Sequence, residues 1–298
     1  MSRTLGPMLA LIVMGAGWGI TSPLSKIAVS TGHQPLGLVF WQMVIGAVLL
    51  GAIVYGRGGR LALGRRQVLL YLVIALLGTI LPNAASYRAA AHLPAGVMSI
   101  VIAMVPMFAF PIALALGQDR FSLARVLGLG LGLGGVALLV GPEASLPDRA
   151  MAAFIPLALI APFFYGLEGN FVGKFGTAGL DPIAVLFGAS VFGAVLSLPL
   201  ALGFGHWVNP LAGFGAAEGA LVLGSGVHAF VYAGYVWLVG RAGAVFAAQV
   251  SYLVTIFGVG WAMLILGEVY SGYIWGALGL MLVGMFLVQP RDREELAA

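Results

Sequence analysis

The pattern of "VPMFAFPIALALGQDRFSLARVLGLGLGLGGVALLVG", residues 105–141, recurs near the end of the chain and indicates how the chain is organised. An apolar run is interrupted by one short polar turn and continues as a glycine-rich apolar run. Residues 264–288, "LILGEVYSGYIWGALGLMLVGMFLV", repeat this order. The aligned pairs are Gly117 with Gly267, Gln118 with Glu268, Ser122 with Ser271, Gly130 with Gly279 and Gly135 with Gly284. Because the polar turn and the glycines align together, we interpret the two stretches as copies of one unit.

The repeat extends to the beginning of each half. With an offset of 147 residues, the matches are Trp18-Gly19 with Tyr165-Gly166, Pro35 with Pro182, Phe40 with Phe187, and "GAVL" at 46–49 with "GAVL" at 193–196. The four-residue match alone has little weight in a chain rich in these residues, but the prolines and glycines align at expected helix boundaries. We therefore predict two equivalent halves, residues 1–142 and 143–298, which together form one functional unit.

The composition places the chain in a lipid bilayer. Hydrophobic residues make up 61% of the chain and charged residues only 8%, and the mean hydropathy is +1.07. Soluble domains carry about 25% charged residues, so a soluble protein of this composition would lack a polar surface. The absence of cysteine excludes disulfides and thiol catalysis, and a scattered net charge of +4 gives no reason to expect nucleic acid binding.

Apolar runs of transmembrane length predict an all-α membrane protein with ten transmembrane helices. The predicted spans are 6–30, 35–55, 67–91, 94–117, 121–141, 151–173, 182–204, 218–240, 242–266 and 271–289. Five spans per half is an odd number, so the two halves must enter the membrane from opposite sides. This gives two inverted-topology five-helix repeats, which is a common architecture of secondary transporters.

The distribution of Lys and Arg predicts the orientation. With both termini in the cytoplasm, eleven of the fourteen cations lie on the inner side, where short loops of membrane proteins accumulate positive charge. These are Arg3, Arg57, Arg60, Arg65, Arg66, Arg120, Arg125, Lys174, Arg241, Arg291 and Arg293. Arg149 lies in an outer loop, and Lys26 and Arg88 fall within spans.

Two five-helix copies with short loops and cytoplasmic termini resemble the drug/metabolite transporter superfamily, in particular its ten-helix EamA-type members. The "WG" at residues 18–19 and the stretches at 105–141 and 264–288 carry this resemblance. Gln118 departs from the Gly-Glu pair that the family usually shows and that Gly267-Glu268 retains, which weakens the idea that an acid there is essential in both halves. We assign Glu268, in a loop, a structural role.

The resemblance also bears on function and location. Within the superfamily, the chain is most similar to bacterial exporters of amino acids, including aromatic ones. This resemblance implies a multi-pass protein of the bacterial plasma (inner) membrane that exports amino acids and similar small metabolites by alternating access. The expected partners are a small-molecule substrate and the lipid bilayer, with a proton as a candidate coupling ion.

Polar and aromatic residues within the spans are the candidate binding residues, because polar groups in a bilayer are costly unless they face a cavity. His228, Tyr232 and Tyr235 share one helical face at i, i+4 and i+7, and Tyr232 lies too deep to anchor at the interface. Glu168 is the candidate for proton coupling. For Glu168, the competing interpretation is a partly wetted residue at the helix end that pairs with Lys174. For the aromatic and polar residues, it is packing in the core. The predicted substrate-binding residues are Trp18, Gln42, Asn83, Tyr87, Arg88, His228, Tyr232, Tyr235, Gln249 and Tyr252.

A multidrug exporter of organic cations is the main alternative, although the first span contains Lys26 and no acid. An intramembrane hydrolase using Ser225 and His228 would lack an orienting acid nearby in sequence. The four histidines are dispersed, and the glycines of residues 128–135 fit helix packing rather than a dinucleotide loop. We therefore predict no enzymatic activity, no metal and no cofactor.

Overall fold

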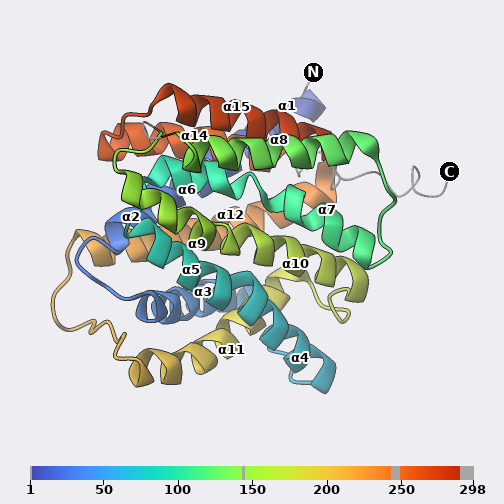
Figure 1. Ribbon diagram of the computed structural model, residues 1–298. Helices are drawn as coiled ribbons and strands as arrows, with labels where there is room; N and C mark the ends of the chain where they lie inside the picture. Colours follow the sequence, from blue (N-terminus) through green and yellow to red (C-terminus); the bar gives the residue numbers. More distant parts are fainter. Residues whose placement is uncertain (1, 143–144, 243–248, 289–298) are drawn as a thin grey trace.

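The computed structural model describes residues 2–142, 145–242 and 249–288, and within these ranges all regular secondary structure is helical (Figure 1). The helices lie side by side, and short connections join them at the two ends of the bundle. The start of α1 and the α7–α8 turn lie at one end, on the right of Figure 1. The α2–α3 and α11–α12 connections lie at the opposite end, on the left. We call these the near end and the far end.

The first half contains eight α-helices and one π-helix. They are α1 (Ser2–Gly19), α2 (Thr21–Ala28), α3 (Pro35–Gly56), α4 (Arg65–Ile74), η1 (Ala75–Ile80), α5 (Leu81–Ala90), α6 (Ala95–Ile102), α7 (Val105–Ala115) and α8 (Leu123–Val140). The described part of the second half begins with a 3₁₀ turn. Its elements are η2 (Arg149–Phe154), α9 (Ile155–Ala158), α10 (Ile160–Phe175), α11 (Pro182–Gly203), α12 (Ala216–Ala242), α14 (Val250–Leu266) and α15 (Gly272–Leu287).

Eight of the helical segments are long and apolar enough to cross a membrane, and α14 and α15 are shorter apolar helices. The protein is therefore a multi-span membrane protein. The described segments follow the predicted spans closely, except that α12 continues to Ala242 and the described part of α14 begins only at Val250. The full count of ten spans and their inverted arrangement remain predictions.

Several spans are broken near their middle, where one continuous helix was expected. The first span breaks between α1 and α2, and the Thr21 hydroxyl donates to the carbonyl of Trp18 at 2.6 Å. The fourth span breaks between α6 and α7, just before Pro106, which has no N–H to continue the helical hydrogen bonds. In the third span the π-helix η1 precedes Pro82, which cannot donate to the carbonyl of Gly78.

Glycines bring α8 and α15 into close contact. A Cβ added to Gly128 would lie 2.6 Å from the carbonyl oxygen of Gly284, and the reverse distance is the same. Gly132 and Gly135 lie against Met107 and Met281 in the same core. The interpretation of residues 128–135 as a helix-packing face is confirmed.

Contacts between the two halves come in corresponding pairs. α8 packs against α15 and α3 against α11, which pairs the fifth and second segments of each half with their counterparts. α1 packs against α14, and α10 correspondingly packs against α7. Two equivalent halves related by a twofold axis would make such a set of contacts.

Loop residues fix the helix ends. Glu268 accepts hydrogen bonds from the backbone N–H groups of Ala95 (2.7 Å) and Gly96 (3.0 Å), and so caps α6. Its structural role is confirmed. The Tyr270 hydroxyl donates to Glu268 at 2.6 Å, and burial raises the pKa of this tyrosine and keeps it protonated as a donor. Lys26 donates to the carbonyls of Ala91 and Leu93 just after α5, so it serves the fold rather than a cavity.

Candidate functional site

A central cavity with a volume of about 820 Å³ lies between helices of both halves. Binding pockets for small molecules commonly measure about 300–1,000 Å³. Residues from α1, α3, α10, α12 and α14 line this cavity, and the broken regions near Thr21, Gly78 and Pro106 also border it. The cavity extends toward the near end, where Gln118 and Gly173 border it.

An aromatic wall forms one side of the cavity. Trp18 of α1 meets three residues of α12, with ring-centroid distances of 6.1 Å to His228, 6.2 Å to Tyr232 and 5.5 Å to Tyr235. These four predicted residues all line the cavity. The buried Nε1 of Trp18 has no hydrogen-bond partner among the described residues. The wall therefore offers apolar ring surface to the cavity.

A polar network from three helices borders a narrower cavity of about 130 Å³ that shares several lining residues with the larger one. The Tyr165 hydroxyl of α10 donates to Asn83 Oδ1 at 2.7 Å. The Asn83 amide donates to Gln42 Oε1 at 3.0 Å, and the Tyr87 hydroxyl donates to the same oxygen at 3.2 Å. The predicted residues Gln42, Asn83 and Tyr87 thus lie together, and Tyr165 connects them to the second half.

Glu168 of α10 lines the larger cavity. Its carboxylate lies against Gly78 of the π-helix η1, in space that a side chain at Gly78 would fill. Within the described part of the chain Glu168 has no ion pair and no hydrogen bond. Lys174 instead donates to the carbonyl of Leu116 at 3.3 Å, so the competing interpretation of a Glu168–Lys174 pair is wrong.

The charge of the site follows from its lining. Among the described residues that line either cavity, Glu168 is the only carboxylate, and none is a lysine or an arginine. The other polar groups there are hydroxyls, amides, the Trp18 indole and the His228 imidazole. A ligand therefore meets one acidic group and otherwise neutral surfaces.

The remaining predicted residues differ in position. Gln249 and Tyr252 line the larger cavity from the start of α14. Arg88 is exposed and lines neither cavity, so we leave it out of the site that we propose. The Ser225 hydroxyl donates to the carbonyl of Leu221 in its own helix, at 2.7 Å, which offers no support for a Ser225–His228 hydrolase pair.

Sequence reasoning missed Tyr165, although a signal for it was present. Tyr165 aligns with Trp18 in the internal repeat, and both residues line the larger cavity. The alignment thus pairs two cavity residues from opposite halves.

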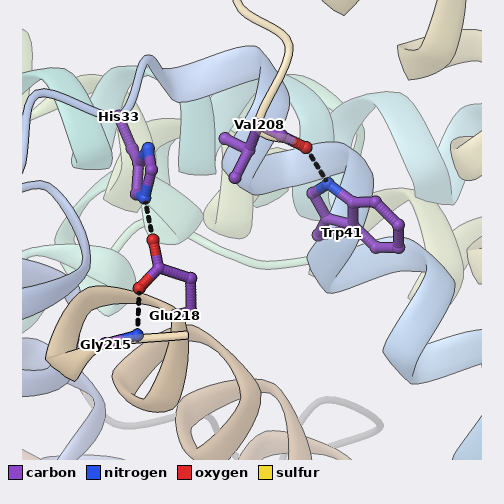
Figure 2. Close-up of polar contacts among 5 residues, drawn as sticks. All are labelled: His33, Trp41, Val208, Gly215 and Glu218. Atoms are coloured by element: carbon purple, nitrogen blue, oxygen red, sulfur yellow. Dashed lines mark hydrogen bonds and ion pairs between the residues drawn. The ribbon is translucent and has the colours of Figure 1, made fainter. Parts of the chain in front are cut away.

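Interactions between the halves join them at the far end of the bundle (Figure 2). His33 Nε2 lies 2.5 Å from Glu218 Oε1, and the other carboxylate oxygen of Glu218 accepts from the N–H of Gly215 at 2.8 Å. The Trp41 indole donates to the carbonyl of Val208 at 2.9 Å. Sequence reasoning did not identify the contact between His33 and Glu218, because 185 residues separate the two.

Comparison with known proteins agrees with this arrangement. The model of the EamA-like transporter family matches residues 5–141 and again residues 153–289. A protein of known crystal structure superposes with a TM-score of 0.61 at 18% identity over 96% of each chain, which shows a common fold alone. No curated protein matches the sequence. Since the family model covers most of the chain in two copies, the chain belongs to the EamA-like transporter family, a family of membrane transporters.

Proposed function

We propose that the protein is a secondary transporter that exports amino acids, including aromatic and other apolar ones, and similar small metabolites. The observation that carries this proposal is the cavity of about 820 Å³ lined by aromatic rings and a few polar groups from both halves. Transporter sites commonly lie at the interface of two repeats near the membrane midplane, next to broken helices. The breaks beside Thr21 and Pro106 border this cavity.

The chemistry of the walls suits an amphiphilic solute. The rings of Trp18, Tyr232 and Tyr235 offer surface to an apolar side chain, and hydroxyl and amide groups offer hydrogen bonds to a polar end. With a single carboxylate among the described lining residues, binding would be weak and tolerant of substrate shape. A carrier needs such binding because it must also release its load.

The two ends of the bundle support an alternating-access mechanism. The larger cavity extends toward the near end, whereas the His33–Glu218 and Trp41–Val208 contacts join the halves at the far end. With the orientation that the basic loops favour, the near end faces the cytoplasm of a bacterial inner membrane. Rocking of one inverted repeat against the other would then open the far end and release the substrate outside.

Glu168 is the residue that we assign to proton coupling. It is the only carboxylate among the described lining residues, and it has no ion-pair partner there. Ionisable residues at such positions in membrane proteins commonly serve proton relays. A proton that enters from the outside would displace substrate from this region and return to the cytoplasm as the transporter resets.

A second candidate, an exporter of organic cations, is favoured by one observation. The combination of a carboxylate with aromatic walls can bind a cation without any acid in the first span. The presence of Lys26 and the absence of an acid in the first span therefore no longer argue against an exporter of organic cations.

Transport by purified protein in liposomes tests both candidates. We expect saturable flux of radiolabelled aromatic or aliphatic amino acids, stimulated by a pH gradient that is acidic on the side of the far end. Glu168→Gln should lose this stimulation, while Asp181→Asn, a matched change at the start of α11, should keep it. Flux of organic cations without flux of any amino acid would favour the second candidate.

A further inference from the structure

We propose that Glu168, with the rings of Tyr165 and Tyr232, forms a subsite for the protonated amino group of the transported molecule. The inference rests on the proposed transport function and names the chemical class of its substrate. This class comprises amines and zwitterionic amino acids of small, apolar character. Carboxylic acids that lack an amino group are excluded from it.

Charge balance is the first argument. Glu168 lines a cavity inside a membrane protein, and no described lysine or arginine lines that cavity with it. A carboxylate in such surroundings is costly unless a partner compensates it. The nearby candidate Lys174 is engaged at the carbonyl of Leu116. A bound ammonium group would supply the missing partner.

The surroundings of Glu168 are the second argument. One side of the carboxylate rests against Gly78, where the absence of a side chain leaves room for it. Tyr165 lies three residues before Glu168 on α10, which is about one helical turn, and Tyr232 of α12 borders the same cavity. Both rings line the same cavity. Aromatic faces attract ammonium groups, and this attraction adds to that of a nearby carboxylate.

The rest of the lining explains why an acid without an amino group is excluded. A carboxylate entering the cavity meets the negative charge of Glu168 and no described lysine or arginine on the walls. The hydroxyl and amide groups on the walls are neutral donors, which can donate hydrogen bonds to the carboxylate of an amino acid whose ammonium group is already bound. Neutral donors alone do not offset the repulsion between two carboxylates.

Three related compounds separate these possibilities in liposomes containing the purified protein. They share a phenyl ring: phenylalanine carries both charged groups, phenethylamine only the ammonium group, and hydrocinnamate only the carboxylate. Each is tested as a competitor of radiolabelled phenylalanine in exchange at equal, neutral pH on both sides, so no proton gradient is needed. We expect competition by phenylalanine and phenethylamine and none by hydrocinnamate.

Variants test the residue itself. Glu168→Gln should weaken competition by phenethylamine by at least about tenfold, because one partner of a desolvated charge pair is lost. Glu168→Asp should retain part of the affinity. Asp181→Asn removes a carboxylate outside the cavity and keeps a good N-cap. In this variant, phenethylamine should compete as strongly as it does in the parent protein.

The outcomes are distinguishable. Competition by hydrocinnamate as strong as that by phenethylamine, or an unchanged affinity for phenethylamine in a folded Glu168→Gln variant, overturns the ammonium subsite while the transport function stands. If the parent protein exchanges none of the three compounds, the proposed function and the subsite are both contradicted.

Discussion

Tyr165 and Trp18 occupy equivalent positions in the two halves, and both line the larger cavity. Trp18 contacts the aromatic residues of α12, whereas Tyr165 donates to Asn83 and so connects the second half to the polar network of the first. A pseudo-symmetric cavity therefore has chemically different walls. This difference allows one wall to contact the apolar part of a substrate and the other its polar part.

Tyr232 is the clearest single-residue test of the aromatic wall. Tyr232→Ala should lower amino-acid flux about fivefold to tenfold, because a well-placed ring contributes on the order of 1 kcal/mol to binding. Phe230→Ala is the matched control, since Phe230 lies on the same helix but is 65% exposed. The measurement is initial flux in liposomes at equal amounts of folded protein. Equal flux of the Tyr232→Ala protein and the parent would contradict a binding role for this wall.

Residue positions were predictable where helical periodicity alone decides them. The spacing of His228, Tyr232 and Tyr235 predicted one face, and all three line the cavity. The position of Arg88 was not predictable, because neighbours on a helix point in different directions: Tyr87 is buried beside the narrower cavity while Arg88 is exposed. Glu168 was identified as an intramembrane acid, but its contact with Gly78 depends on packing between two spans.

Helices α8 and α15 can cross only because glycines let their backbones come close together. Gly128→Val should destabilise the protein by about 1–3 kcal/mol, because its Cβ would lie 2.6 Å from the carbonyl oxygen of Gly284. Gly130→Val, two residues away with nothing within 4 Å of an added Cβ, should change stability by less than about 0.5 kcal/mol. Thermal unfolding of the purified variants in detergent measures the difference. Equal melting temperatures would mean that the two helices do not approach this closely.

Apolar run length predicted the helical segments well, but it did not predict where they break. Pro106 and Pro82 were visible in the sequence, yet prolines inside membrane helices are often accommodated without a break. The break at Ile20 lies within one turn of Pro23, which cannot donate to the carbonyl of Gly19, and the Thr21 hydroxyl bonds to the carbonyl of Trp18. Tertiary packing around the cavity decides these sites, and a single-sequence pattern does not contain it.

At the scale of the whole molecule, the sequence repeat predicted two halves, and the family model matches each of them. The contact of His33 with Glu218, which also joins the halves, is not reproduced by the repeat, because His33 aligns with Leu180 at the offset of 147 residues. Closure of one end is inherently asymmetric, because only one end of a carrier is open at a time. Such contacts therefore lie outside what an internal repeat can predict.

The orientation of the molecule is tested by placing single cysteines in a chain that has none of its own. Leu63 and Leu211 are exposed leucines in connections that we assign to the near and far ends, and replacing them alters no charge. In intact cells an impermeant thiol reagent should label Leu211→Cys and leave Leu63→Cys unlabelled until the membrane is permeabilised. This pattern follows because basic loops remain in the cytoplasm, which places the near end and its open cavity inside. The reverse pattern would make the cavity face outward and would contradict export from this state. Labelling of both cysteines in intact cells would show that the two connections lie on the same side, and the arrangement of inverted repeats would then be wrong.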